Sequence, residues 1–300
     1  MAAPSLRDRV RYSFLSMKPD RPSSTAFRVA MRRAAHQILD RPLVLEDPIA
    51  LRIVGPRADE IRANPKRYDS SFGRALRLFL VARSRCAEDA LAQAVAQGVR
   101  QYVILGAGLD TFAYRNPYAP DQLRVFEVDM PTTQAFKREL LARTKIASPA
   151  SLTFVPVNFE TQSLPEELRA AGFREGEPAF FSWLGVTMYL TRDAVLTALG
   201  DVARLPTRSG ITFDYMLPPN RLPWLRRIGF YFVARRVAAA GEPWITWFDP
   251  DELARTLREL GFTRLEDLDG PALDQRFFGG RERHVGGTSV GRVMTAMVGA

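Results

Sequence analysis

Apolar residues beyond about residue 100 gather in short, uninterrupted runs that are bounded by turn residues or by helical stretches. These runs lie at 102–105, 124–129, 152–157, 179–184, 211–215, 262–268 and 292–298. Continuous rather than alternating hydrophobicity is typical of strands buried on both faces of a parallel sheet. Helical patterns separate most of the runs, at 132–144, 165–171, 192–204 and 250–260. The alternation predicts a doubly wound α/β sheet with seven candidate strands.

The first hundred residues follow a different pattern, with helical spacing of apolar residues and frequent prolines. Thr25 is placed to cap a helix that runs to about Ile38, and a longer helix is predicted over 70–97, with Gly98 ending it. We therefore expect a helical N-terminal extension over residues 1–98 and an α/β domain over residues 99–300.

The segment 217–248 interrupts the rhythm of strands and helices and is rich in aromatic residues and arginines. Because it follows a strand whose carboxyl end should open onto a site, it is predicted to be a mobile lid over the substrate. One of Arg221, Arg226 and Arg227 is expected near an anionic group of that substrate. The alternative is an amphipathic helix whose aromatics cover the sheet or a dimer partner.

Composition narrows the class of protein. The chain has 300 residues, 46% of them hydrophobic, and a net charge of +9. Arginine supplies 38 of the 42 basic residues, and these are scattered between apolar positions, which argues against a nucleic-acid groove. With one cysteine, Cys86, and two histidines, His36 and His284, no disulfide or zinc site is expected, although carboxylate sites for hard cations stay open. No membrane span or signal peptide is predicted, so we expect a cytoplasmic protein, monomeric or homodimeric.

The most informative motif is a strand that runs into two glycines, Gly106 and Gly108, at 102–111. The next strand ends in Asp129, 21 residues beyond Gly108, where an acid can accept hydrogen bonds from ribose hydroxyls. A dinucleotide-binding motif would have a third glycine where Thr111 stands, and Asp110 would place negative charge beside a diphosphate. A cofactor without phosphates, S-adenosylmethionine, fits these residues better than NAD.

Several motifs taken together resemble the leucine carboxyl methyltransferase family, and more closely its bacterial branch of S-adenosylmethionine-dependent O-methyltransferases. They are EDP at 46–48, RSR at 83–85, ILGAGLDT at 104–111, FEVD at 126–129 with Pro131 and Lys137, VPVNF at 155–159 and FSWLGVTMYL at 181–190. The resemblance covers roughly residues 25 to 270. It implies a class I methyltransferase fold with a mostly parallel seven-stranded sheet.

The resemblance also implies roles for single residues at the cofactor. Arg83, with Arg85 as the near alternative, would hold the carboxylate of the cofactor, which a guanidinium can take bidentately. Gly106 and Gly108 would face its methionine portion and Asp129 its ribose. The adenine would lie against Asn158 and Phe159.

On the acceptor side, Tyr189 is the candidate catalytic residue and would orient the acceptor oxygen. The alternative is that Tyr189 is a tyrosine of the core. His36 and His284 are weaker candidates for a base that a phenol acceptor would need. Leu184 stands where leucine carboxyl methyltransferases proper have a glutamate, which favours the small-molecule branch.

The resulting prediction is an S-adenosylmethionine-dependent O-methyltransferase of secondary metabolism, needing no metal. It would act on a carboxylate or hydroxyl of a small apolar or aromatic, polyketide-like metabolite. Two alternatives stay open: a nicotinamide-dependent oxidoreductase, and a cofactor-binding interaction protein without turnover.

Overall fold

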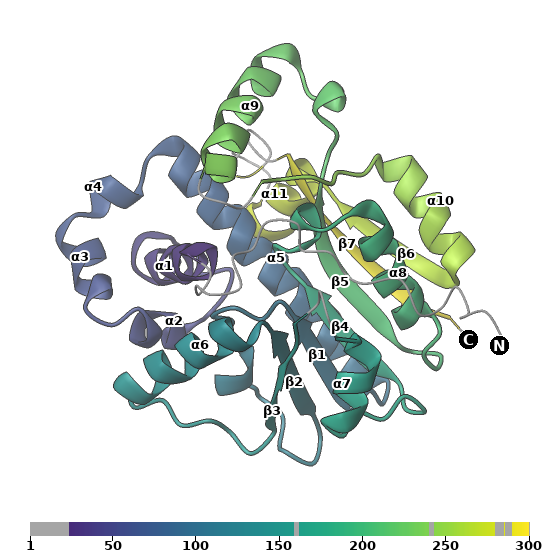
Figure 1. The fold of residues 1–300 in the computed structure, drawn as a ribbon. Helices are drawn as coiled ribbons and strands as arrows, with labels where there is room; N and C mark the ends of the chain where they lie inside the picture. Colours follow the sequence, from purple (N-terminus) through teal and green to yellow (C-terminus); the bar gives the residue numbers. More distant parts are fainter. Residues whose placement is uncertain (1–23, 159–161, 240–242, 280–284, 286–289, 300) are drawn as a thin grey trace.

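The computed structural model of the chain describes residues 24–158, 162–239, 243–279, 285 and 290–299 (Figure 1). All seven predicted strands are present in one sheet. Their bounds are β1 Gln101–Leu105, β2 Arg124–Asp129, β3 Leu152–Pro156, β4 Ala179–Trp183, β5 Gly210–Met216, β6 Phe262–Leu268 and β7 Gly291–Val298. The order is β3-β2-β1-β4-β5-β7-β6, and only β7 runs antiparallel to its neighbours. The predicted mostly parallel α/β fold is confirmed.

The order of the strands determines where a ligand can bind. From β1 the chain moves outward to β2 and β3 and then returns to add β4 and β5 on the other side of β1. In open α/β sheets the crevice at such a reversal, outside the carboxyl ends of the strands, receives the ligand. The edge at which β1 to β5 end is therefore the place to look for the site.

Helices before the sheet form a group at the left of Figure 1, and α5 runs between this group and the sheet. Their bounds are α1 Ser24–Leu39, α2 Pro48–Ile53, α3 Arg57–Ala63, α4 Pro65–Tyr68 and α5 Ser71–Ala96. Ser70 caps α5 by accepting from the backbone N–H of Gly73 at 3.2 Å. Because α1 already includes Ser24, Thr25 lies inside the helix rather than at its cap. The division into a helical extension and an α/β domain stays a prediction.

Six further α-helices follow β1 along the described chain. They are α6 Pro131–Arg143, α7 Leu164–Ala170, α8 Arg192–Ala203, α9 Trp224–Ala239, α10 Pro250–Leu260 and α11 Gly270–Phe278. Figure 1 places α9, which belongs to the segment 217–248, at the top of the view, away from the layers around the sheet. Among the described residues, no helix is long and apolar enough to cross a membrane.

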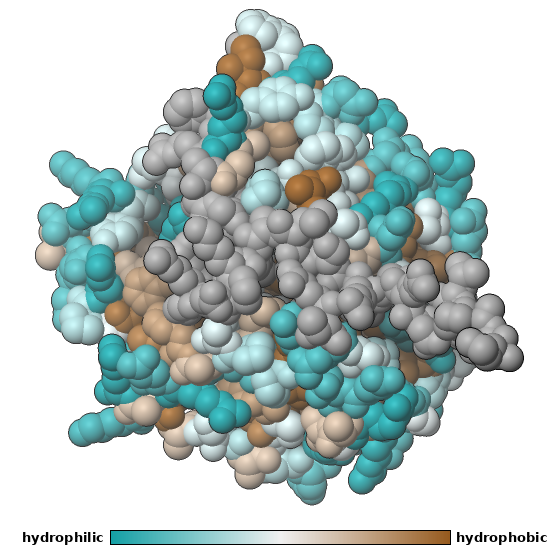
Figure 2. Space-filling view, in the orientation of Figure 1, coloured by the Kyte–Doolittle hydropathy of each residue, from teal (hydrophilic) through white to brown (hydrophobic). Residues whose placement is uncertain are grey.

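Hydrophilic side chains surround the face shown in Figure 2, with smaller hydrophobic patches between them. On α9 the side chains of Trp224 and Ile228 are exposed. The core lies around the central strands instead, since every residue of β1, β4 and β5 is buried.

Candidate functional site

The glycine turn after β1 has the backbone geometry that only glycine adopts without strain. Gly106 has φ +63° and Gly108 has φ +51°. A Cβ at Gly106 would lie 2.4 Å from Cγ2 of Val186, and one at Gly108 would lie 3.1 Å from Cβ of Ala26 in α1. The turn is therefore confined between the segment after β4 and the first helix.

Asp129, at the carboxyl end of β2, closes the other side of this turn. Its Oδ2 accepts a hydrogen bond from the backbone N–H of Gly108 at 2.5 Å, and its Oδ1 accepts from the N–H of Met130 at 2.7 Å. Burial raises the pKa of this carboxyl, and the hydrogen bonds from the backbone N–H groups of Gly108 and Met130 oppose that shift. The side chain of Thr133 bonds to the same carboxylate. A carboxylate at this strand end is a suitable acceptor for ribose hydroxyls.

A buried network joins the turn to the N-terminal helices. The hydroxyl of Thr111 donates to Oδ1 of Asp47 at 2.8 Å, and the same Asp47 oxygen caps α2 by accepting from the N–H of Ala50 at 3.0 Å. Arg33 of α1 donates to both Asp47 and Thr111. The polar residue at the sixth position of the motif thus anchors the turn to another part of the chain.

Beneath the turn lies a buried ion pair between Glu127 of β2 and Lys137 of α6. Lys137 Nζ donates to Glu127 Oε2 at 2.5 Å and to the backbone carbonyl of Asp110 at 2.6 Å. Both side chains are 1% exposed, and burial raises the pKa of Glu127 to about 7. Glu127 Oε1 has no hydrogen-bond partner among the described residues, so the pair is only partly satisfied.

The chain after the turn lacks the helix that a dinucleotide site uses. Residues 112–114 form the short 3₁₀ helix η2, and residues 115–123 continue to β2 as turns and loop. Without a helix N-terminus aimed at the turn, no donor array awaits a diphosphate. The geometry therefore argues against the nicotinamide alternative.

Arg83 of α5 reaches the carboxyl ends of β4 and β5. Its side chain is 8% exposed, and its Nη1 donates to Oδ2 of Asp214 in β5 at 2.6 Å. Its Nε is buried and has no hydrogen-bond partner in the described part of the chain. Arg85, the near alternative, is half-exposed and paired with Asp89 on the same helix. Of these two arginines, Arg83 is the one that has an unused donor near the strand ends.

Asn158 follows β3 at the same edge, partly buried, and its backbone N–H donates to Oε1 of Gln162 at 2.7 Å. The other residue expected at the adenine, Phe159, lies outside the described residues. Leu184, directly after β4, is half-buried.

Tyr189 lies in the 3₁₀ helix η3, Thr187–Tyr189, beyond β4 and is half-buried. It packs against an apolar cluster built from Met188, Met216, Leu222 and Phe230. Leu222 and Phe230 come from the segment 217–248, and the rings of Phe230 and Trp244 lie 5.5 Å apart. The insertion thus covers the side of the site that holds Tyr189.

The end of this insertion is tied to the sheet. The N–H of Ile245 donates to the carbonyl of Met188 at 2.8 Å, and that of Phe248 donates to the carbonyl of Met216 at 2.9 Å. These backbone bonds fix the segment near residue 245 across the ends of η3 and β5.

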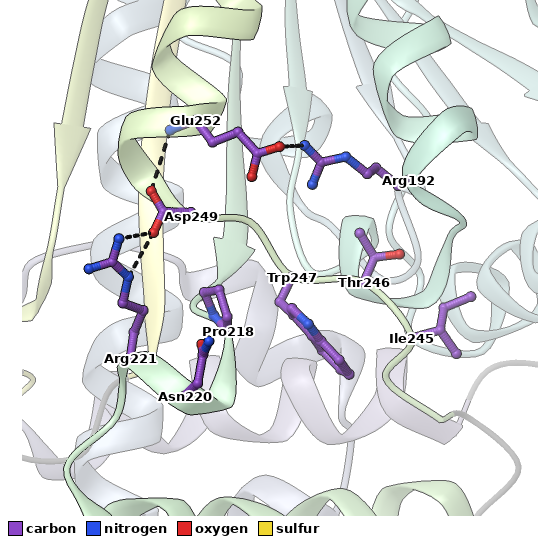
Figure 3. A pocket seen from close by; sticks show the side chains of 9 residues that line it. All are labelled: Arg192, Pro218, Asn220, Arg221, Ile245, Thr246, Trp247, Asp249 and Glu252. Atoms are coloured by element: carbon purple, nitrogen blue, oxygen red, sulfur yellow. Dashed lines mark hydrogen bonds and ion pairs between the residues drawn. The ribbon is translucent and has the colours of Figure 1, made fainter.

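A separate pocket of about 610 Å³ lies between α8, α10 and the segment 245–249 (Figure 3). Figure 3 shows Trp247 on its wall, with one ion pair between Arg221 and Asp249 and another between Arg192 and Glu252. Its lining includes none of the glycine-turn residues, so it is not the expected cofactor site. Arg221, one of the arginines expected near a substrate anion, is engaged by Asp249. Arg227 is exposed, and the side chain of Arg226 lies outside the described ones.

His36 and Cys86 play no part in this edge of the sheet. His36 is fully buried in α1, where Nδ1 bonds to Asp40 at 2.9 Å and Nε2 accepts from the N–H of Val44 at 3.2 Å. Both ring nitrogens are therefore occupied in holding the N-terminal helices, and His284 lies outside the described residues. Cys86 is buried, which raises its pKa to about 12. No group of metal-ligating side chains is found among the described residues.

Comparison with known proteins identifies the family to which this chain belongs. The sequence profile described as "Leucine carboxyl methyltransferase" matches residues 26–203. The chain is 30% identical, over 89% of its own length and 94% of the relative's, to the Bacillus subtilis protein named "Putative S-adenosyl-L-methionine-dependent methyltransferase YktD". A Frankia alni protein with the corresponding name is 29% identical over 79% of this chain and 93% of its own.

Among solved structures, a Thermobifida fusca protein described as a "putative methyltransferase" superposes with a TM-score of 0.50 at 15% identity, covering 94% of this chain and 96% of that one. That likeness shows the fold. The sequence matches show more: this chain belongs to the leucine carboxyl methyltransferase family and is a methyltransferase that uses S-adenosylmethionine.

Proposed function

We propose that this methyltransferase transfers a methyl group to a carboxylate or hydroxyl oxygen of a small apolar or aromatic, polyketide-like metabolite. The observation that carries this proposal is the apolar cluster over Tyr189, in which Met188, Met216, Leu222 and Phe230 are all buried. Apolar side chains next to Tyr189 favour an acceptor with an apolar body, with a few polar groups to orient the reacting end.

The cofactor would lie along the carboxyl ends of the strands, where three features fit its parts. Gly106 and Gly108 would face the methionine portion, at a turn whose positive φ angles favour glycine. Asp129 presents a buried carboxylate to the ribose, and Asn158 stands at the end of β3 for the adenine, with Phe159 beside it in the sequence.

The fourth feature is Arg83, whose buried Nε lacks a partner among the described residues. A buried polar donor left unpaired costs about 1–3 kcal/mol, and the α-carboxylate of the cofactor would remove that cost with a charge-assisted bond.

The bound cofactor supplies a methyl group already activated by its sulfonium. The protein then has to align the acceptor oxygen with that methyl group and exclude water. In this proposal the hydroxyl of Tyr189 orients the acceptor oxygen, and the apolar side chains around it exclude water. A carboxylate acceptor needs no general base, whereas a phenol would need one, and His36 is unsuited to that task because both its nitrogens are bonded.

Leu184 supports the small-molecule assignment. Leucine has no group that could accept a hydrogen bond from the α-amino group of the cofactor, as the glutamate expected from the resemblance would. A role on the carboxyl terminus of a protein phosphatase is therefore not what these residues favour.

The test is methyl transfer from methyl-labelled S-adenosylmethionine to three matched acceptors: an aromatic carboxylic acid, the phenol of the same ring size, and a peptide that ends in leucine. We expect label on the acid or the phenol, with the ester distinguished from the ether by its release in mild base. Label on the peptide alone, or only on nitrogen or carbon of any acceptor, would contradict the proposal.

A further inference from the structure

We propose that Asp214 is a positioning residue, which aims Arg83 so that one edge of its guanidinium faces the carboxylate of the cofactor. This inference rests on the proposed role of Arg83 and extends it to a residue for which no role has been assigned. Asp214 is a carboxylate in the middle of β5, whose seven residues are all buried.

The bonds of Asp214 fix it from three directions. Its Oδ2 accepts from Nη1 of Arg83 at 2.6 Å, and its Oδ1 accepts from the backbone N–H of Gly185 at 2.5 Å. Its backbone carbonyl accepts from the hydroxyl of Thr187 at 2.6 Å. One carboxylate thus links α5, the turn after β4 and the centre of β5.

The role of Asp214 follows from which nitrogen of the Arg83 guanidinium it contacts. A guanidinium is planar, and Nε together with Nη2 forms the side-on edge that takes a second carboxylate bidentately. Asp214 bonds to Nη1, which does not belong to that edge, and Nε is the buried atom without a partner among the described residues. The pair with Asp214 therefore neutralises the buried arginine and still leaves its side-on edge for a ligand.

Gly185 is the second part of the arrangement. It has φ +76°, and a Cβ added there would lie 2.9 Å from Nη2 and 3.2 Å from Nη1 of Arg83. A side chain at residue 185 would push the guanidinium away, so glycine allows Arg83 to pack against the turn after β4. The same turn carries the N–H that holds Asp214.

The experiment compares two ligands by calorimetry. S-adenosylhomocysteine has the amino-acid carboxylate, and 5′-methylthioadenosine has the same adenosine and thioether without the amino acid. With Asp214→Asn, we expect the affinity for S-adenosylhomocysteine to fall by about tenfold or more, because the aimed, charge-assisted contact is lost. The affinity for 5′-methylthioadenosine should stay within about threefold. A residue with a merely structural role would weaken both ligands alike.

Asp267→Asn is the matched control, because Asp267 of β6 is also paired with an arginine, Arg292, at 3.0 Å. It should change neither affinity. If Asp214→Asn does not fold, Gly185→Ala supplies the same test, since it displaces the guanidinium while the ion-pair partners remain.

The outcomes separate the two proposals. Equal losses for both ligands, or no loss for either, would overturn the positioning role of Asp214 and leave the cofactor site standing. A wild-type protein that binds the two ligands equally would overturn the assignment of Arg83 to the carboxylate, and the role of Asp214 with it.

Discussion

The two sides of the site are built from different kinds of contact. On the cofactor side, buried charged groups hold the turn: Asp129 bonds to the backbone of Gly108, Lys137 to the backbone of Asp110, and Asp47 to the hydroxyl of Thr111. On the acceptor side, Tyr189 is surrounded by apolar side chains, several of them from the insertion.

This difference explains why the residues specify the cofactor more closely than they specify the acceptor. Directional bonds to buried groups fix positions to within tenths of an ångström and suit one ligand of invariant chemistry. Apolar contacts set size and shape but tolerate many ligands. The cofactor could therefore be named from this chain, whereas the acceptor could be named only by class.

The largest effect should come from disturbing the cofactor side directly. Gly106→Val would place branched carbons where even a Cβ lies 2.4 Å from Val186, at a residue with φ +63°. We expect S-adenosylhomocysteine affinity to fall by about a hundredfold or more, with a stability loss of about 1–3 kcal/mol for the strained backbone. Gly176→Val is the control, because a Cβ there meets nothing within 4 Å. Calorimetry and urea unfolding give both quantities, and unchanged affinity would remove the turn from the site.

A pH-dependent effect should follow from the buried pair under the turn. Lys137→Met leaves Glu127 without its cation, and a lone buried charge costs about 3–5 kcal/mol. The cost applies only when Glu127 is ionised. Its pKa is raised from 4.5 to about 7, so the proton it keeps in the folded state stabilises the fold below about pH 4.5, and that contribution is lost as the pH rises through 7.

We therefore expect Lys137→Met to lose more unfolding free energy at pH 8 than at pH 6, as measured by urea titration. Adding Glu127→Gln should restore part of the loss at pH 8 and flatten the pH dependence. A loss that does not change with pH would show that the lysine acts through packing alone.

A smaller effect is expected from the acceptor side. Tyr189→Phe removes one hydroxyl, worth about 1 kcal/mol, and should lower kcat/KM for the acceptor by about five- to tenfold. The affinity for S-adenosylhomocysteine should not change, because Tyr189 is not among the residues proposed to contact the cofactor. If kcat/KM for the acceptor and the affinity for S-adenosylhomocysteine fall by the same factor, the site is not divided into a cofactor side and an acceptor side.

The smallest effect concerns the insertion, and hydrogen exchange measures it. If the insertion is a lid, α9 should exchange fast in the free protein and be protected only when S-adenosylhomocysteine and an acceptor are both bound. Trp224, Ile228 and Tyr231 of α9 are exposed in the free protein, as a lid that has not closed over an acceptor requires. If α9 is protected from exchange to the same extent with and without the two ligands, the helix is a fixed cover and not a lid.

Sequence reasoning found the strands because their signal is local. β2 and β6 have the predicted bounds. The sequence does not predict α11, whose nine residues are separated from the end of β6 by one residue.

The site was predicted in part for the same reason. Gly106, Gly108 and Asp129 lie within 24 residues and form a recognisable motif, whereas Asp214 is 131 residues from Arg83 and looks like part of a core strand. The sequence offers one indication of a role for Asp214, which is its charge within an otherwise apolar strand. Only the folded chain shows that its partner is an arginine with an unused edge.

The most direct test of the central claim is calorimetric titration of S-adenosylhomocysteine into the wild-type protein and into Asp129→Ala. The account predicts micromolar-class affinity for the wild type and no detectable binding for the variant. Its physical reason is that two ribose hydroxyls lose their acceptor, at about 1–3 kcal/mol each, and that the N–H of Gly108 loses the bond that holds the turn. Wild-type affinity in a folded Asp129→Ala protein would contradict the placement of the cofactor at this edge of the sheet.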